Sequence, residues 1–459
     1  MLKSYYNLIR VLVSSLFLVG CSSDDSTSYQ PLNVDALDDT AQVFQNASIT
    51  IDVLSNDINV IEEGTLNATT SANATIEVLN NNTPSNPSDD MIRYIPNGIF
   101  FGEDSFQYTI CTSEQNCDTA TVTVTVTGVS PVNFNLDNMP YDTLDEYNFF
   151  QGDMSDLDPV FGVLPYDLIT PLFSDYASKK RFVWMPSGEK ASYVNDYSIL
   201  DFPVGTILIK SFYYDNVLPS NTKRIMETRL QIKKESGWVF ANYKWNDVQT
   251  EAILDLNGSS EPIEFEIDGV IRNVNYSVPA GSQCLTCHKS DNDVPFPIGM
   301  KPQSLNKNYN YTNGSMNQLE KLEEQGYLSS GYPTDIVSHV DYTDDTQSLE
   351  LRVRSYLDIN CAHCHSENGH CNYRPVRFSF KESGEDIANL GVCVDAHEVF
   401  DSALTKIVEP GNADRSILAY RISTIEESLR MPLLARRLNH DKGIALVEDW
   451  INTLNTNCD

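Results

Sequence analysis

The chain has 459 residues, with 31 basic and 64 acidic side chains and a formal net charge of −33. A surface this acidic repels phosphate backbones, so nucleic acid is excluded as an expected partner. Hydrophobic residues make up 41% of the chain and aromatic residues 10%, which excludes global disorder. The length predicts about three domains.

Residues 1–20 have the pattern of an export signal peptide. Lys3 and Arg10 precede an apolar run at 11–19, which is too short to span a bilayer. The run ends in Leu-Val-Gly-Cys21, which resembles the lipobox of bacterial lipoproteins. The resemblance implies a lipid anchor on Cys21 and a place at the outer membrane or cell surface, facing the periplasm or the exterior. An ordinary secretory signal with a chance cysteine is the alternative.

After a polar tether at 21–34, residues 35–128 predict an all-β domain. Apolar and polar residues alternate at 49–53 and again at 122–126, which is the period of half-buried strands. The segments 51–57, 94–96 and 102–106 resemble bacterial immunoglobulin-like and cadherin-like repeats. The resemblance implies a β-sandwich with a spacing or adhesive role.

Oxygen-bearing side chains in this domain are candidate calcium ligands, because hard oxygen donors suit that ion. They are Asp38, Asp39, Asn56, Asp57 and Asp104. The alternative, which we favour, is that they are solvated loop residues.

Residues 140–280 predict a second β-rich domain, with aromatic strands such as those at 204–210 and 238–245. This stretch contains no Cys or His, so no metal site or nucleophile pair is expected there. Helical periodicity follows at 349–357 and 444–454, and a shorter helix is expected at 317–325.

Two segments of the C-terminal half have the form Cys-x-x-Cys-His, the attachment signature of c-type haem. On one helical turn both thiols lie on one face and can add to the two vinyl groups of a porphyrin, while the histidine binds its iron. Chance predicts about 0.003 such motifs for this composition. Zinc ribbons usually separate their pairs by about 15–20 residues, and a thioredoxin-like dithiol needs a βαβ context, so both alternatives are disfavoured. The residues are Cys284, Cys287 and His288, then Cys361, Cys364 and His365.

Methionines near these motifs are candidate sixth ligands. Met431 precedes a proline on a loop before the last expected helix, where a thioether would raise the reduction potential of the second haem. A role as a core gap-filler is its alternative. Met300 is the candidate at the first haem, since the loop after His288 is long enough to wrap the ring edge. Met316 and His339 compete with it, and a five-coordinate iron is a further alternative.

The region from 140 to the C-terminus resembles a family of dihaem c-type cytochromes of largely unassigned role. Besides the two haem motifs, the matching segments are 164–168, 170–176, 408–412, 416–418 and 440–443. The resemblance implies two covalent haem c groups, a first haem segment at 281–344 and a cytochrome c-like domain at 345–459. The expected fold is therefore multidomain: an Ig-like sandwich, a central β-rich domain and a mostly α-helical, cytochrome c-like haem region.

Five cysteines lie outside the lipobox and the haem motifs. Cys111 and Cys117 flank a polar turn between strands and are disulfide candidates. Cys371 and Cys393 both fall between the second haem motif and Met431, where a disulfide would pin the loop. Cys458 is left over and is expected to be unpaired. Free thiols are the alternative throughout.

We therefore expect a lipid-anchored electron carrier with two haem irons and no catalytic residue. The acidic surface favours a basic redox partner protein. A dihaem peroxidase or oxidase, with an open coordination position at the first haem, is the main alternative. An adhesin that carries redox modules is the other.

Overall fold

The structure is a computed structural model that describes residues 33–458 except 99, 113–115, 291 and 435. The chain divides into two compact units, with the boundary between Gly128 and Val129. The expected export signal and Cys21 lie outside the described residues. Within the described part of the chain, no helix has the length and apolar composition needed to cross a bilayer.

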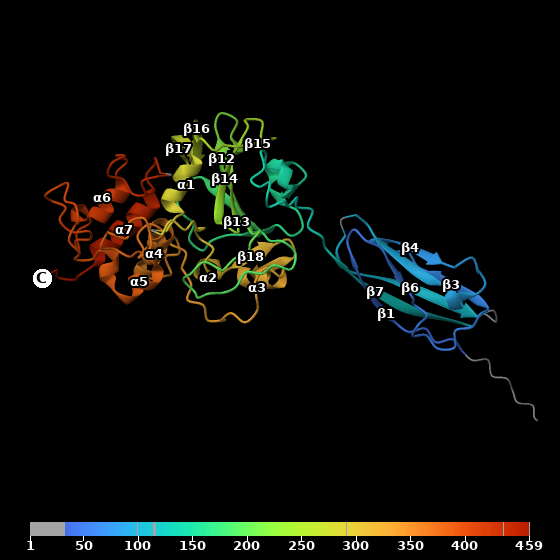
Figure 1. Ribbon diagram of the computed structural model, residues 1–459. Coiled ribbons are helices and arrows are strands. Elements are labelled where there is room, and N and C mark those ends of the chain that lie inside the picture. The colour runs from blue at the N-terminus through green and yellow to red at the C-terminus, as the bar shows by residue number, and fades with distance from the viewer. Residues whose placement is uncertain (1–32, 99, 113–115, 291, 435, 459) are drawn as a thin grey trace, which may run out of the picture. The chain divides into compact units, whose positions relative to one another are not determined.

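The first unit is a sandwich of two sheets (Figure 1). One sheet has the order β1 (Asp39–Phe44), β7 (Cys117–Thr127), β6 (Gly102–Thr112), β3 (Gly64–Ala68), and the other the order β2 (Ile49–Ile51), β5 (Met91–Pro96), β4 (Ala74–Leu79). Only β1 and β7 run parallel among these pairs. Val122, Val124 and Val126 of β7 point into the core because successive strand residues alternate between faces. The predicted disulfide between Cys111 and Cys117, at the β6–β7 turn, is confirmed.

The second unit is built on an eight-stranded sheet, and its strands run in the order β10-β11-β12-β13-β14-β15. The β16–β17 hairpin joins this sheet through β12. The strands are β10 (Leu164–Tyr166), β11 (Ser178–Trp184), β12 (Ile207–Val217), β13 (Thr222–Lys234), β14 (Gly237–Trp245), β15 (Ala252–Leu254), β16 (Ser259–Ile267) and β17 (Val270–Val278). Two small hairpins are separate from it: β8 (Phe150–Gln151) with β9 (Asp158–Pro159), and β18 (Asn308–Tyr311) with β19 (Gly314–Asn317).

Both faces of this sheet are covered. Ile207 and Ile209 of β12 pack against a cluster drawn largely from residues 139–163, while Leu208 packs on the opposite face with residues from 300–336. A strand that is buried on both faces reads as a continuous apolar run, which explains the sequence at this point. The central strands are therefore interior elements of the second unit.

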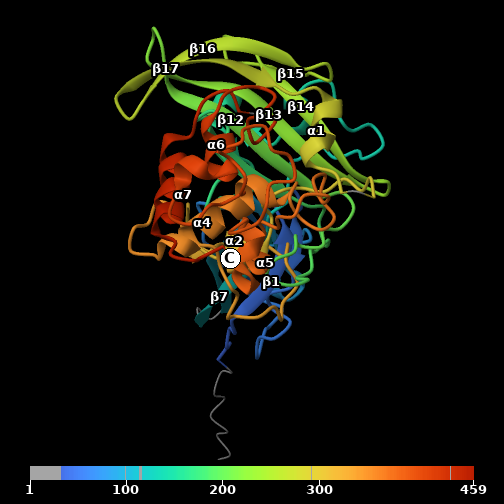
Figure 2. The same cartoon turned by 90° about the vertical axis from the view of Figure 1, so that its left-hand side faces the viewer.

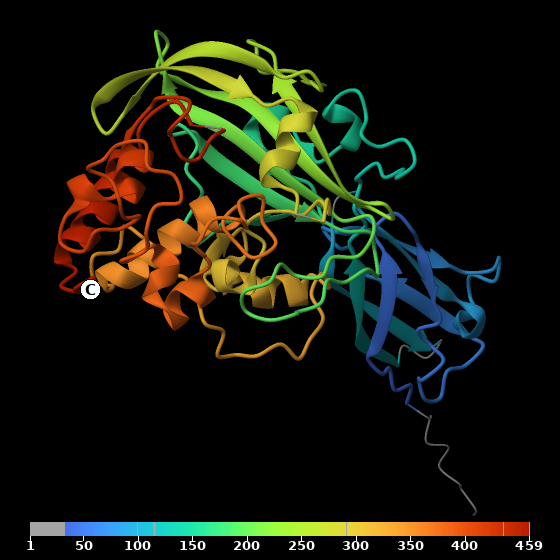
Figure 3. The same ribbon diagram turned by 60° about the vertical axis from the view of Figure 1, so that its left-hand side comes forward.

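The helices follow the sheet in the sequence (Figures 1 and 3). They are α1 (Gly281–Cys287), α2 (Pro302–Leu305), α3 (Gln318–Glu324), α4 (Leu349–Leu357), α5 (Phe380–Glu385), α6 (Ile417–Ser423) and α7 (Asp441–Thr453), with a π-helical turn at Asp358–Ala362. Single 3₁₀ turns occur at Pro87–Asp89, Asp145–Tyr147, Met154–Asp156, Ile387–Leu390 and Ala413–Arg415. Figure 3 shows α1 lying along the sheet beside β14, which it contacts. The β16–β17 hairpin reaches toward the start of α7 (Figure 2), where Arg272 pairs with Asp441 at 2.7 Å.

The expectation of a mostly α-helical, cytochrome c-like C-terminal region is wrong. The chain is β-rich, and its helices after Gly281 have only 4 to 13 residues. Long turns separate them because polar side chains bond to their own backbone: Asp341 accepts from Thr343, and Asp344 accepts from Thr346. The three expected helices are present as α3, α4 and α7, but they do not add up to a helical domain.

The disulfide expected between Cys371 and Cys393 is also wrong. Cys393 is bonded to Cys458, with an S–S distance of 2.05 Å, so Cys458 is not unpaired. Cys371 is a buried free thiol. Its backbone N–H donates to the carbonyl of Cys364, which holds Cys371 beside the second Cys-x-x-Cys-His motif. The disulfide instead joins the end of the chain to the loop at Cys393.

Candidate functional site

Two adjoining cavities of the second unit contain the two Cys-x-x-Cys-His motifs. We call Cys284–His288 motif 1 and Cys361–His365 motif 2. The motif-1 cavity has a volume of about 1340 Å³ and the motif-2 cavity about 1090 Å³, with their open mouths included. Five residues line both: Cys287, Asn360, His363, Pro432 and Leu434. The structure therefore brings the two motifs, which are far apart in the sequence, to a common wall.

Motif 1 is presented by α1 and the residue that ends it. The helix begins after Ala280, whose N–H donates to the Gln283 side chain at 3.0 Å, and it carries Cys284 and Cys287 one turn apart. His288 follows as the C-cap, and its Nδ1 lies 3.0 Å from the carbonyl oxygen of Phe296. A hydrogen on Nδ1 would satisfy that carbonyl and leave the Nε2 lone pair for a metal, as in most metal-binding histidines.

The imidazole of His288 is held in the neutral form. Burial lowers its pKa to about 3, and the nearby charge of Lys210 acts in the same direction. Its ring also contacts Phe240 of β14, with the ring centroids 4.7 Å apart. Because only neutral imidazole binds iron, this environment suits a ligand.

The sheet supplies a polar wall to the motif-1 cavity. Glu227 is fully buried and accepts hydrogen bonds from Arg229 and from the hydroxyl of Tyr276, both at 2.6 Å. The loop after α6 adds further guanidinium groups, from Arg430, Arg436 and Arg437. This side of the cavity can therefore receive a negatively charged group.

Motif 2 follows directly from α4. That helix is capped by Ser348, whose hydroxyl accepts from Leu351 N–H, and it runs into the π-helical turn that carries Cys361. Burial, together with neighbouring positive charges, lowers the pKa of His365 to about 4. Nδ1 of His365 is buried without a hydrogen-bond partner among the described residues.

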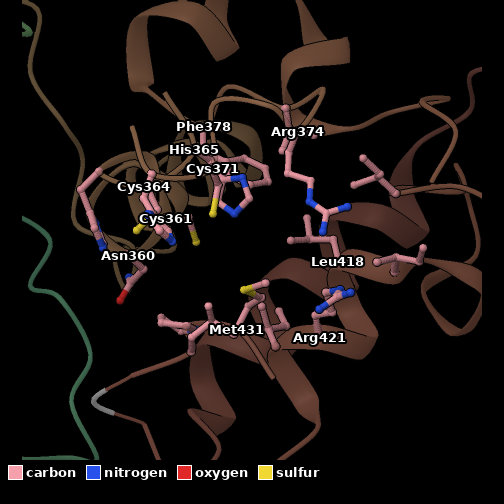
Figure 4. A pocket seen from close by; sticks show the side chains of 18 of the residues that line it. Asn360, Cys361, Cys364, His365, Cys371, Arg374, Phe378, Leu418, Arg421 and Met431 are labelled. Carbon is pink, nitrogen blue, oxygen red and sulfur yellow. The ribbon is translucent and has the colours of Figure 1, made fainter. Parts of the chain in front are cut away.

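Met431 and His365 lie on opposite sides of the motif-2 cavity (Figure 4). Apolar side chains, including Phe378 and Leu418, form much of the wall between them. Arg374 and Arg421 also line the cavity (Figure 4). The structure thus brings together the predicted histidine and the predicted methionine of the second haem.

A buried carboxylate ties the segment after motif 1 to the helix before motif 2. Asp358 accepts from Lys301 Nζ at 3.0 Å, from Gln303 Nε2 at 3.3 Å and from Phe380 N–H at 2.8 Å. Burial alone would raise the pKa of Asp358, but Lys301 and His339 hold it well below its usual range. The ion pair therefore persists at neutral pH and fixes the start of motif 2.

The methionine and histidine candidates at the first haem lie elsewhere. Met300 is fully buried in a hydrophobic cluster with residues such as Leu305 and Leu319. Met316 belongs to β19, and His339 lies 3.3 Å from the hydroxyl of Ser304. None of the three is among the described residues that line the motif-1 cavity.

The calcium candidates of the first unit are only partly grouped. Asn56 donates to the carbonyl of Asp38, and the charges of Asp38 and Asp57 act with burial to raise the pKa of Asp39 to about 6. Asp104 instead accepts hydrogen bonds from Ser71, Asn73 and Tyr94. The structure therefore does not bring all five together through hydrogen bonds.

Several residues of the site were not found from the sequence. The arginines of both cavities carry no motif, although Glu-Thr-Arg-Leu-Gln-Ile at 227–232 alternates in a strand and could have indicated a polar interior face. His363 was also missed. Among the described residues, it forms with Cys287 and Cys364 the one group of three or more His, Cys, Asp or Glu residues whose ligand atoms all lie within 4.8 Å of one another.

A further buried histidine packs behind motif 2. Nδ1 of His440 lies 3.0 Å from the hydroxyl of Tyr356, Nε2 lies 3.2 Å from that of Tyr342, and the ring stacks on Phe173 at 4.2 Å. Burial lowers its pKa to about 4, with Lys179 and Lys442 adding to the effect and Asp441 opposing it.

This shift predicts a loss of stability in mild acid. Unfolding returns the pKa of His440 to about 6.5, so between pH 6.5 and 4 the unfolded chain binds more protons and stability falls as the pH falls. The full loss is about 3 kcal/mol. Melting temperatures of the protein at pH 7 and pH 4.5 would measure it, with His440→Phe as the variant that lacks the titrating group. Equal pH dependence in both proteins would contradict the assignment.

Comparison with known proteins identifies the first unit. The family described as Bacterial Ig domain matches residues 30–125, and such domains are typical of extracellular or surface proteins. No curated protein matches the chain.

Matching solved structures are distant. They include a 2,6-sialyltransferase of Vibrionaceae Photobacterium sp. JT-ISH-224, at 9% identity over 20% of this chain and 18% of that chain, with a TM-score of 0.16. An endo-fucoidan hydrolase from glycoside hydrolase family 107 matches at 11% identity over 44% and 26%, with a TM-score of 0.17. The human desmocollin-1 ectodomain matches at 11% identity over 51% and 56%, with a TM-score of 0.16. This chain covers less than two thirds of the length of each of these three chains.

Proposed function

We propose that this chain is a dihaem c-type electron-transfer protein that acts outside the cytoplasm. The observation that carries the proposal is that each Cys-x-x-Cys-His motif lines its own cavity, and that the two cavities share a wall. Bound haem supplies reversible one-electron chemistry of its iron. The proposal concerns covalent haem attachment and does not depend on a cytochrome c fold.

The donor set of the motif-1 cavity fits this group. Two thiols stand one turn apart on α1, and the adjacent imidazole is neutral, with its Nδ1 beside a backbone carbonyl. A second-shell carbonyl of this kind fixes the ring orientation of a metal ligand. His288 can therefore hold an iron without reorganisation of its surroundings.

Unpartnered arginine atoms support haem over a bare metal ion. In the motif-1 cavity the buried Nε atoms of Arg229, Arg430 and Arg436 have no hydrogen-bond partner among the described residues. A zinc ion would repel these cations, whereas haem carries two carboxylates that guanidinium groups bind well. The lining holds four arginines against two carboxylates, Asp175 and Glu427, and this excess of positive charge favours an anionic ligand.

The motif-2 cavity sets the environment of the second iron. Phe378 and Leu418 give the cavity that contains His365 and Met431 part of its apolar lining. The soft thioether of Met431 favours the reduced metal, and the apolar walls act in the same direction, so both raise the reduction potential. The residues thus bind, orient and tune the group.

The proposed location rests on the first unit and on the disulfides. A bacterial Ig domain together with the Cys111–Cys117 and Cys393–Cys458 bonds is typical of an oxidising compartment. A lipid anchor at Cys21 belongs to this proposal. The net charge of −33 favours a basic redox partner, whose association rate would fall as salt screens the attraction.

The test is the haem content of the protein made in cells that carry out cytochrome maturation. After denaturation in alkaline pyridine we expect a c-type haemochrome spectrum with two haems per chain. No haemochrome band, with stoichiometric zinc instead, would overturn the proposal. Carbon monoxide added to the reduced wild-type protein separates a carrier, which stays inert, from a dihaem peroxidase or oxidase, which binds it.

A further inference from the structure

His363 stands at the boundary between the two cavities. It occupies the second variable position of motif 2, and its side chain lines the motif-1 cavity as well as the motif-2 cavity. Its ligand nitrogen lies within 4.8 Å of the Cys287 sulfur. Nδ1 of His363 is buried and has no hydrogen-bond partner among the described residues. A histidine of motif 2 therefore has an unpartnered ring nitrogen and lines the motif-1 cavity, where it could bind a metal.

Local geometry turns His363 away from the role of His365. Residues two apart on a helical turn do not face the same way, and His363 is two residues from both Cys361 and His365. In the motif-2 cavity His365 lies on one side and Met431 on the other, and these two would hold the second iron. His363 lines both cavities and lies within 4.8 Å of the sulfurs of Cys287 and Cys364, and the two ligands proposed for the second iron leave its imidazole unused.

Few side chains of the motif-1 cavity can bind haem iron. Proteins use His, Met, Cys or Tyr for this purpose. Once His288 and the two haem-attaching cysteines of motif 1 are set aside, the described residues that line this cavity offer His363 and Tyr276. The hydroxyl of Tyr276 donates to Glu227 at 2.6 Å, and burial and that carboxylate raise its pKa well above the usual value. A phenol held in this way is a poor source of the phenolate that iron binds.

We propose that the imidazole of His363 is the sixth ligand of the first haem iron, opposite His288; this inference rests on the function proposed above. The first iron then has two imidazole ligands, and the second has an imidazole and a thioether. Because a methionine ligand raises the reduction potential, the first haem has the lower potential of the two. A first iron with both axial positions filled also leaves no place for peroxide or oxygen.

The test compares His363→Ala with His370→Ala, whose histidine lines only the motif-2 cavity. Both variants are purified with haem and examined by electron paramagnetic resonance, optical spectra and carbon monoxide binding. We expect two low-spin haems in the wild type and in His370→Ala. In His363→Ala we expect two haems, one of them high-spin and able to bind one equivalent of carbon monoxide, and added imidazole should restore the low-spin spectrum.

A second variant covers the case in which the alanine protein does not fold. His363→Met keeps a ligand, so we expect two low-spin haems and a higher potential at one of them. Low-spin spectra in His363→Ala with both haems present would overturn the inference, as would a change seen instead in Tyr276→Phe. An unchanged potential in His363→Met would also overturn it. A wild-type protein without haem would instead overturn the proposed function itself.

Discussion

Replacing Cys361 and Cys364 together by alanine should leave one covalent haem per chain in place of two. Thioether bonds to these two sulfurs are what retains haem after denaturation, and both cysteines lie at the motif-2 cavity. The haem of motif 1 should stay attached, because Cys284, Cys287 and His288 are unchanged in this variant. Alkaline pyridine spectra and the mass of the intact chain measure the loss directly.

The matched control is Cys371→Ala. Cys371 is a free cysteine that lines the same cavity but lies outside the motif, so this variant should keep two haems. The mirror variant, Cys284→Ala with Cys287→Ala, should also keep one haem, with the spectrum of motif 2. Two haems in either double variant, or one haem in the control, would rule out the assignment of the motifs.

The parts of the site that were predictable are those with local geometry. Cys-x-x-Cys-His places its sulfurs and imidazole through one turn of chain, whatever the surrounding fold. Met431 was singled out by its place on the loop before the last helix, α7, and the structure places it in the motif-2 cavity with His365.

The parts that were missed depend on tertiary structure. His363 reaches the motif-1 cavity only because motif 2 packs beside Cys287, which no local pattern encodes. Arg229 is a strand residue, and the alternating pattern of a strand does not tell whether such a side chain faces solvent or a cavity. The pairing of Cys393 with Cys458 depends on where α7 ends, and disulfide connectivity cannot be deduced from cysteine positions alone. The helical periodicity at 349–357 and 444–454 correctly predicted α4 and α7. The chain between these two helices is mostly turns and short helices, so the region as a whole is not mainly helical.

The central sheet contributes residues to the motif-1 cavity. The sequence did not predict this role, because the sheet contains no Cys or His. On β13, Ile232 belongs to the hydrophobic core, Arg229 and Gln231 line the motif-1 cavity, and Leu230 does both. The wall of the motif-1 cavity is thus made partly by a β-sheet. If haem binds there as proposed, the short segment at 281–344 supplies the attachment motif and the sheet supplies part of the enclosure.

Substitution of Met431 and of Met300 should have different effects, because we assign Met431 as an iron ligand and Met300 as a core residue. Met431→Ala should lower the reduction potential of one haem and let its reduced form bind carbon monoxide, because the thioether facing His365 is lost. Met300→Ala should leave both potentials and the spectra unchanged. It should instead lower the free energy of unfolding by about 2–5 kcal/mol, since Met300 is fully buried in an apolar cluster.

Redox titration, carbon monoxide binding and thermal unfolding of the two variants measure these effects side by side. A changed haem spectrum in Met300→Ala, or an unchanged potential in Met431→Ala, would refute the ligand assignment. Combination with His363→Ala extends the argument, because the two substitutions open different irons. The double variant should bind two equivalents of carbon monoxide where each single variant binds one, and a single equivalent would mean that both methionine and histidine act on the same iron.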